Sequence, residues 1–116
     1  MRTGVLTKAG GEVVCRRLEL ADTPWRRLRG LLGRSGLGPE EGLLLRPAGS
    51  IHTFFMRFPI DAVFCDRDLV VLGVERELRP WRVAARRGAR AVVELPAGAA
   101  AGVERGDRLV LATMGA

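Results

Sequence analysis

The sequence predicts an α+β fold that is mostly β: a small barrel-like or rolled antiparallel sheet with one helix from the N-terminal half packed on it. Short apolar segments separated by Gly, Pro and Asp recur along the chain, and they outnumber helical segments by about three to one. Only one segment carries apolar residues at helical spacing. With 47% hydrophobic and 28% charged residues, the 116-residue chain has the composition of one globular domain, residues 1–116.

The chain is expected to begin with a β-hairpin. Residues 4–8 and 12–20 are rich in Val and Leu, and Gly10 and Gly11 lie between them. Glycine adopts the positive φ angles of a tight hairpin turn without steric cost. Strands are therefore predicted at 4–8 and 12–20.

A single helix is expected after this hairpin. Asp22 or Thr23 can cap it and Pro24 suits its first position, where the missing N–H costs nothing. Gly33 or Gly36 is expected to end it. Its apolar face would contain Trp25, Leu28, Leu31 and Leu32.

The rest of the chain is expected to be extended segments joined by turns. Strands are predicted at residues 43–45, 51–56, 60–65, 69–78, 89–95 and 108–112. Pro59 disfavours the helical region for Phe58, so the chain should bend between the second and third of these segments. The turn at residues 66–68 makes the clearest hairpin, whereas residues 79–88 read as an irregular, basic connection.

The candidate functional site lies in residues 50–61, where polar side chains interrupt an apolar, aromatic segment. A buried polar group without a partner costs roughly 2–7 kcal/mol, so such groups are either paired or exposed for use. His52 is the only histidine of the chain, and imidazole titrates near neutral pH. The predicted ligand-binding residues are His52, Thr53, Phe54, Met56, Arg57 and Asp61.

Several roles remain open for these residues. His52 is either a hydrogen-bonded wall residue, a ligand contact or a proton carrier. Arg57 either pairs with Asp61 across the bend or presents its planar fork to a carboxylate, phosphate or sugar acid. Phe54 and Met56 either pack in the core or form a platform beside the polar groups. A hydrolase that uses His52 with Asp61 or Cys65 is the weakest of these interpretations, because no nucleophile motif surrounds Cys65.

A second candidate is the basic segment from Arg76 to Arg90. The net charge of +6 and the cluster of cations around one indole are compatible with RNA or another acidic polymer. The simpler interpretation is a solvated basic loop, in which Glu94, expected on the outward face of its strand, pairs with an arginine. The patch residues are Arg79, Trp81, Arg82, Arg86, Arg87 and Arg90.

Three motifs resemble domain-of-unknown-function family 192, a widespread prokaryotic family. They are residues 50–61, the Glu94-Leu95-Pro96-Ala97-Gly98 run and the Gly106-Asp107 turn, and the resemblance extends from about Arg29 to Asp107. It implies a compact, mostly β domain with a barrel-like sheet and one or two helices. The family offers no established activity to carry over, and some relatives look exported. Many members have Phe-Trp-Met-Lys where this chain has Phe54-Phe55-Met56-Arg57, which keeps the aromatic character and the cation.

Several enzyme classes lack their signatures. There is no phosphate-binding loop, no Gly-x-Ser-x-Gly elbow and no second histidine for a two-histidine metal site. Cys15 and Cys65 are expected to be reduced and buried, with one disulfide as the alternative. Residues 1–8 lack the apolar core of a secretory signal, so we expect a cytoplasmic protein. The sequence thus predicts a non-enzymatic module, without metal or cofactor, that binds a small polar or anionic ligand or a protein partner around His52, Arg57 and Asp61.

Overall fold

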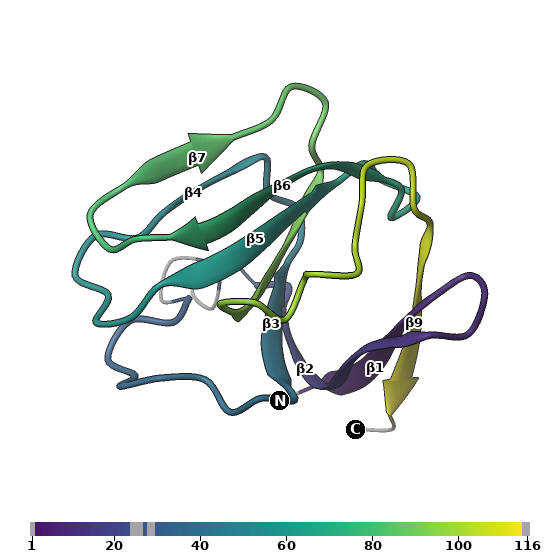
Figure 1. The fold of residues 1–116 in the computed structure, drawn as a ribbon, viewed down its shortest axis with the longest axis horizontal. Coiled ribbons are helices and arrows are strands. Elements are labelled where there is room, and N and C mark those ends of the chain that lie inside the picture. The colour runs from purple at the N-terminus through teal and green to yellow at the C-terminus, as the bar shows by residue number, and fades with distance from the viewer. Residues whose placement is uncertain (1, 24–26, 28–29, 115–116) are drawn as a thin grey trace.

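The computed structural model describes residues 2–23, 27 and 30–114, and these residues form a mostly β structure (Figure 1). The strands expected from the apolar segments are present, several of them within one or two residues of their expected bounds. The described strands are β1 (Thr3–Lys8), β2 (Val13–Ala21), β3 (Glu41–Leu45), β4 (Ser50–His52), β5 (Ile60–Cys65), β6 (Val71–Leu78), β7 (Val83–Ala85), β8 (Ala91–Pro96) and β9 (Leu109–Met114).

Seven of the strands form one sheet in the order β6-β5-β8-β3-β2-β1-β9, and β4 pairs with β7 in a separate two-stranded sheet. The large sheet is not purely antiparallel as expected, because β2 and β3 run parallel. A parallel pair needs a crossover rather than a hairpin, and residues 22–40 provide it. Strand β8 lies inside the sheet, between β5 and β3.

The large sheet is rolled but does not close into a barrel, so the barrel-like part of the prediction is wrong. Its edge strands β6 and β9 approach each other only where they begin. There Val70 and Arg108 form an isolated bridge, and the Leu109 N–H donates to the Leu69 carbonyl oxygen at 2.9 Å. Beyond this point the two edges are unpaired with each other, as the open side of the fold in Figure 1 shows.

Both faces of the central strands are buried. Val93 and Leu95 of β8 pack in one apolar cluster with Leu6, whereas Val92 packs in a second cluster with Phe64. Successive side chains of a strand point to opposite faces, so the sheet separates these two clusters. The second cluster lies beneath the segments that carry the candidate site.

The packed helix is not confirmed. Pro24, Trp25 and Leu28 lie outside the described residues, so most of the expected segment carries no structural statement. Arg27 is helical, and its N–H donates to the Thr23 carbonyl oxygen at 3.0 Å, but residues 30–33 form turns. Among the described residues no helix is long and apolar enough to cross a bilayer.

Two further expectations need correction near the site. The strand expected at 51–56 ends at His52, because Phe55 has a φ of 64°, which an extended strand cannot contain. The segment expected to be irregular at 79–88 contains β7, which pairs antiparallel with β4. These two short strands hold the candidate site over the second cluster.

Candidate functional site

Asp61 is a buried carboxylate occupied by the protein itself. Its oxygens accept the backbone N–H groups of Glu77 at 2.9 Å, Gly98 at 3.0 Å and Ala100 at 2.9 Å. The ion pair with Arg57 considered above is not formed, and Arg57 is exposed to solvent. Asp61 therefore joins β5, the end of β6 and the turn after β8, and it has little capacity left for a ligand.

Thr53 is also buried and fully occupied. Its hydroxyl Oγ1 donates to the Arg79 carbonyl oxygen at 2.6 Å and accepts the Arg82 N–H at 2.9 Å. Its own carbonyl oxygen accepts the Trp81 N–H at 2.9 Å. Thr53 thus fastens the segment after β4 to the segment before β7, and it positions the site without facing a ligand.

His52 lies at the end of β4 and is exposed. Its Nδ1 atom accepts the Phe54 N–H at 3.3 Å. A neutral imidazole that accepts at one nitrogen carries its proton on the other. Nε2 of His52 is therefore the donor of the neutral ring.

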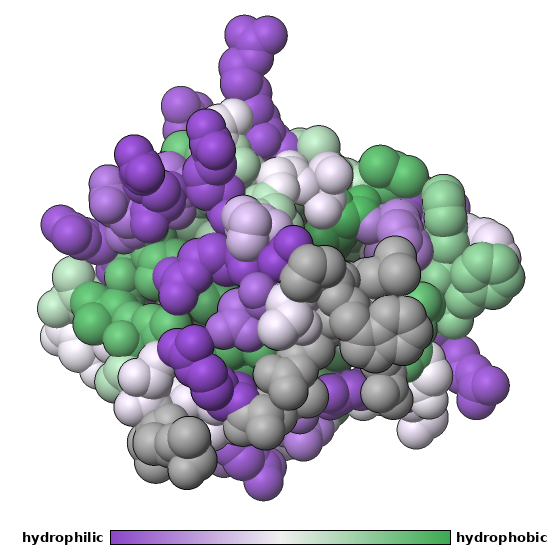
Figure 2. All heavy atoms as spheres, turned by 180° about the vertical axis from the view of Figure 1, so that it is seen from behind, coloured by the Kyte–Doolittle hydropathy of each residue, from purple (hydrophilic) through white to green (hydrophobic). Residues whose placement is uncertain are grey.

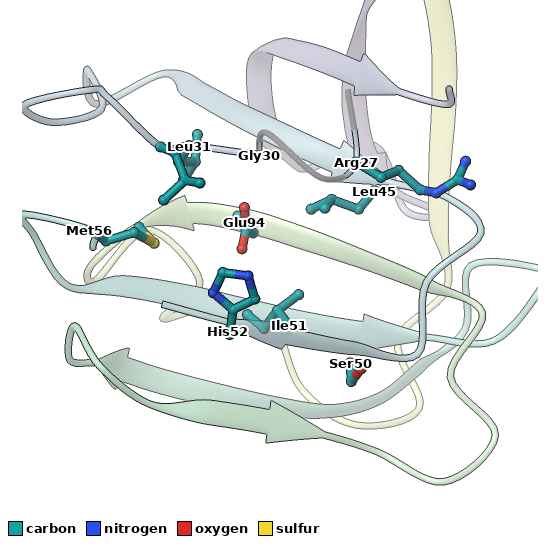
Figure 3. Close-up of a pocket in the computed structure, with 10 residues that line it drawn as sticks. Arg27, Gly30, Leu31, Leu45, Ser50, Ile51, His52, Met56 and Glu94 are labelled. Atoms are coloured by element: carbon teal, nitrogen blue, oxygen red, sulfur yellow. The ribbon is translucent and has the colours of Figure 1, made fainter. Parts of the chain in front are cut away.

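Glu94 is a candidate site residue that the sequence interpretation missed. It was expected to point outward from its strand, but only 3% of it is exposed. The Glu94 side chain lies on the face of β8 that the second apolar cluster covers. Burial raises the pKa of Glu94 to about 7. Among the described residues its carboxylate has no hydrogen-bond or ion-pair partner, and Figure 3 shows it pointing toward the ring of His52.

A cavity of about 90 Å³ separates Glu94 from His52. Its walls are largely apolar, and the guanidinium of Arg27 points away from it (Figure 3). The Arg27 side chain instead donates to the Asp22 carbonyl oxygen at 3.2 Å. The lining residues are Arg27, Gly30, Leu31, Leu32, Leu45, Ser50, Ile51, His52, Met56 and Glu94. Of the predicted ligand-binding residues, the structure brings only His52 and Met56 to this cavity.

A row of rings continues from His52 to the surface. The ring of Phe54 lies 5.0 Å from that of His52 and 5.9 Å from that of Trp81, and the Phe55 and Trp81 rings are 4.6 Å apart. Phe55 is 70% exposed and Trp81 56%. Both adopt left-handed backbone conformations, with φ of 64° and 66°, which is costly for a side chain of this size. Hydrophobic side chains gather on this side of the molecule, at the right of Figure 2.

The predicted basic patch is divided by intramolecular contacts. Arg86 pairs with Glu75 at 2.9 Å and lies over the Phe64 ring at 5.5 Å. Arg82 donates to a backbone oxygen of its neighbour Trp81 at 3.3 Å. The remaining members Arg79, Arg87 and Arg90 are exposed. Hydrophilic side chains project at the top of Figure 2, near the connection from β7 to β8.

The hydrolase interpretation does not find its residues together. Burial raises the pKa of the Cys65 thiol to about 12, so a thiolate is disfavoured at neutral pH. Cys65 packs in the first apolar cluster, on the other side of the sheet from the cavity. Both cysteines are buried and unbonded. Among the residues described, no group of three His, Cys, Asp or Glu side chains is placed to hold a metal ion.

Two solved structures resemble this fold over most of its length. One is a protein from Sinorhizobium meliloti 1021, proposed to be a transcription regulator, with 26% identity, a TM-score of 0.81 and coverage of 95% of this chain and 92% of that one. The other is a protein of unknown function from Novosphingobium aromaticivorans, with 28% identity, a TM-score of 0.79 and coverage of 93% and 83%.

Two further proteins are similar to this chain in sequence. A UPF0127 protein from Thermococcus sibiricus is 34% identical over 81% of this chain and 64% of its own length. A UPF0127 protein from Pyrococcus abyssi is 34% identical over 71% of this chain and 73% of its own length. The chain thus spans less than two thirds of the Thermococcus protein. The profile of the domain-of-unknown-function family 192, described as "Uncharacterized ACR", matches residues 5–111, and the chain belongs to this uncharacterised family.

Proposed function

We propose that this protein is a non-enzymatic binding module whose ligand inserts a small polar group between His52 and Glu94. One observation carries the proposal: Glu94, a residue that is 3% exposed, points its carboxylate into a cavity, and this carboxylate has no partner among the described residues. No side-chain oxygen of the described residues is both sealed from solvent and unpaired, so the Glu94 carboxylate opens onto this cavity and a small group can reach it. Burial disfavours the ionised form of Glu94, and a ligand that donates a hydrogen bond to the carboxylate offsets part of that cost.

The chemistry of the two side chains defines the inserted group. Nε2 of His52 donates, and Glu94 accepts when ionised. A neutral group with one acceptor and one donor, such as a primary amide or an amino alcohol, satisfies both. An anion is a poorer ligand here, because it would share the cavity with the Glu94 carboxylate.

The size of the cavity restricts how much of the ligand enters. At about 90 Å³ it exceeds the roughly 10–15 Å³ that one water needs but is smaller than the roughly 300 Å³ of typical small-molecule pockets. Only a head group therefore enters, and the rest of the ligand lies outside. We assign that part to the rings of Phe54, Phe55 and Trp81, where stacking contributes binding energy.

The other predicted residues are assigned supporting roles. Arg57 follows the cavity residue Met56 and is exposed, so we place it at the rim, where it can contact a polar substituent of the ligand. Thr53 and Asp61 hold the surrounding segments through their own hydrogen bonds. No chemical step is assigned, because His52 is not joined to a nucleophile among the described residues.

Acetamide is a suitable probe, since it carries one amide group and little else. Titration of the ¹⁵N-labelled protein should shift the amide signals of residues 50–56 and 92–95, with a Kd in the millimolar range expected for a four-atom fragment. The variant Glu94→Met replaces the carboxylate by an apolar side chain of similar length, and His52→Phe retains a ring without a donor. Both should weaken binding about tenfold or more.

Glu104→Met is the matched control, because Glu104 is exposed and remote in sequence from the cavity. Its binding of acetamide should equal that of the unmodified chain. Saturable binding that persists in both Glu94→Met and His52→Phe contradicts the proposal, as does the absence of any saturable shift in this region.

A further inference from the structure

A second cleft lies at the end of the sheet where β3 ends at Leu45 and β8 begins at Ala91. It has a volume of about 310 Å³, and three of the four residues that line it are arginines: Arg46, Arg67 and Arg90, with Pro47 as the fourth. Each arginine comes from a different connection. Arg46 follows β3, Arg67 lies in the turn between β5 and β6, and Arg90 immediately precedes β8.

Backbone hydrogen bonds hold these three connections together. The Arg90 N–H donates to the Cys65 carbonyl oxygen at 2.8 Å, next to the turn that contains Arg67. The Arg90 carbonyl oxygen accepts the Ala48 N–H at 3.0 Å, two residues beyond Arg46. The connection that carries Arg90 is therefore fixed to both of the others, so the sheet sets the backbone positions from which the three arginines line the cleft.

The three guanidinium groups lack intramolecular partners among the described residues. Four other described arginines pair with carboxylates, for example Arg2 with Asp22 at 2.8 Å and Arg86 with Glu75 at 2.9 Å, whereas exposed arginines such as Arg105 form no such pair with a described residue. No such pair involves Arg46, Arg67 or Arg90 within the described part of the chain.

Two carboxylates, Asp66 and Asp68, flank Arg67 in the chain, and neither forms an ion pair with the three arginines among the described residues. Oδ1 of Asp66 accepts the backbone N–H groups of Asp68 at 2.8 Å and Val70 at 3.0 Å, which shapes the turn that carries Arg67. Three cations gathered in one cleft repel one another, and an anion between them removes that repulsion.

We propose that this cleft binds the phosphate group of a small phosphorylated molecule. Guanidinium groups bind phosphate oxygens in a planar, often bidentate geometry, and three of them offer more donors than a monoanion needs. The volume is near the lower limit of small-molecule pockets, which suits a phosphate with a short substituent. The cleft shares no lining residue with the cavity at Glu94, so this site is independent of the function proposed above.

The test is an NMR titration of the full chain with inorganic phosphate at constant ionic strength, followed by a titration with glycerol phosphate. We expect saturable shifts of residues 46–48, 66–68 and 89–91. Arg67→Gln and Arg90→Gln should each weaken phosphate binding about fivefold or more, since each removes one charge-assisted contact. Arg105→Gln, an exposed arginine outside the cleft, should leave the Kd unchanged.

Three outcomes overturn this proposal. One is the absence of saturable shifts with both phosphate compounds. Another is an equal loss of affinity in Arg105→Gln, which would mean that net charge rather than the cleft attracts the anion. The third is binding of a single-stranded oligoribonucleotide, lost in Arg67→Gln and Arg90→Gln, without binding of either small phosphate, which would assign the cleft to nucleic acid.

Discussion

Two buried carboxylates on neighbouring strands of this protein are treated in opposite ways. Asp61 of β5 lies opposite Leu95 of β8, and Glu94 of β8 lies opposite Ala62 of β5. Residues paired across two strands share a face, whereas consecutive residues alternate, so the two carboxylates point to opposite faces of the same sheet.

Asp61 and Glu94 are buried to a similar extent, but they differ in their hydrogen-bond partners. Asp61 is 1% exposed and accepts three backbone N–H groups. Glu94 is 3% exposed, has no partner among the described residues, and has a pKa raised to about 7. Burial alone therefore does not identify a functional carboxylate. The carboxylate that forms no bond within the fold is the better candidate, because its oxygens remain available to a donor in the cavity.

The largest predicted effect comes from removing the satisfied carboxylate. Asp61→Ala leaves the N–H groups of Glu77, Gly98 and Ala100 without an acceptor in a buried region, and we expect the free energy of unfolding to fall by about 4 kcal/mol. Urea unfolding measures this change. Asp22→Ala removes an exposed partner of Arg2 and should cost at most about 1 kcal/mol. Equal effects of the two substitutions would contradict a structural role for Asp61.

Removing the charge of Glu94 should stabilise the protein, whereas removing that of Asp61 should destabilise it. The pKa of Glu94 rises from 4.5 to about 7 on folding, so the native state holds the proton more tightly than the unfolded chain. Its contribution to stability is complete below about pH 4.5 and is lost as pH rises through 7. Because each pKa unit is worth about 1.4 kcal/mol, Glu94→Gln should increase the free energy of unfolding by about 3 kcal/mol at pH 9 and by little at pH 4.

Urea unfolding at a series of pH values measures this difference, and the ¹³C shift of the Glu94 carboxyl reports its pKa directly. Glu104→Gln, at an exposed position, should leave the pH profile as it is. A Glu94→Gln profile parallel to that of the unmodified chain would show that Glu94 ionises normally, and the contrast with Asp61 would then disappear.

A third substitution tests whether the buried Thr53 hydroxyl holds the segment before β7 in place. Thr53→Val keeps the shape of the side chain but removes the hydroxyl that bonds the Arg79 oxygen and the Arg82 N–H. We expect a loss of about 2 kcal/mol by urea unfolding. Thr113→Val, at an exposed position in β9, should change the free energy of unfolding by less than about 0.5 kcal/mol. A small effect at Thr53 would mean that the 79–82 segment is held by other contacts.

The sequence was sufficient for most strands because their signals are local. The run Ile60–Cys65 is a strand with the expected bounds, and the 66–68 turn joins it to β6. Strict alternation would put Leu72 and Val74 on one face of the sheet, but it fails within β6. Val74 packs in the first cluster and Leu72 in the second, because the register shifts at Leu72, between the pairs Phe64–Gly73 and Cys65–Val71.

The site was harder to predict because its partners are distant in sequence. His52 was identified as the candidate from its own segment, but Glu94 lies on another strand and reaches the cavity only through the fold. The same holds for Asp61, whose partners Gly98 and Ala100 follow β8. An apolar run on both sides of Glu94 was the available signal, since a strand buried on both faces buries its charged residue as well.

The smallest predicted effect concerns the rings beside the cavity. Phe55 holds a φ of 64° although it is 70% exposed, so its backbone conformation costs about 1–2 kcal/mol while its side chain gains little from burial. Glycine relieves that cost but loses about 0.5–1 kcal/mol through greater freedom of the unfolded chain. Phe55→Gly should therefore raise the free energy of unfolding by about 0.5 kcal/mol, measured by urea unfolding. The same variant should lose the stacking surface for the ligand.

The control is Phe54→Gly, which has no such strain to relieve and should destabilise the chain. An equal loss of stability in both variants would mean that the left-handed backbone of Phe55 costs the fold little. Phe55 would then not be a residue that the fold holds in a strained conformation for the site.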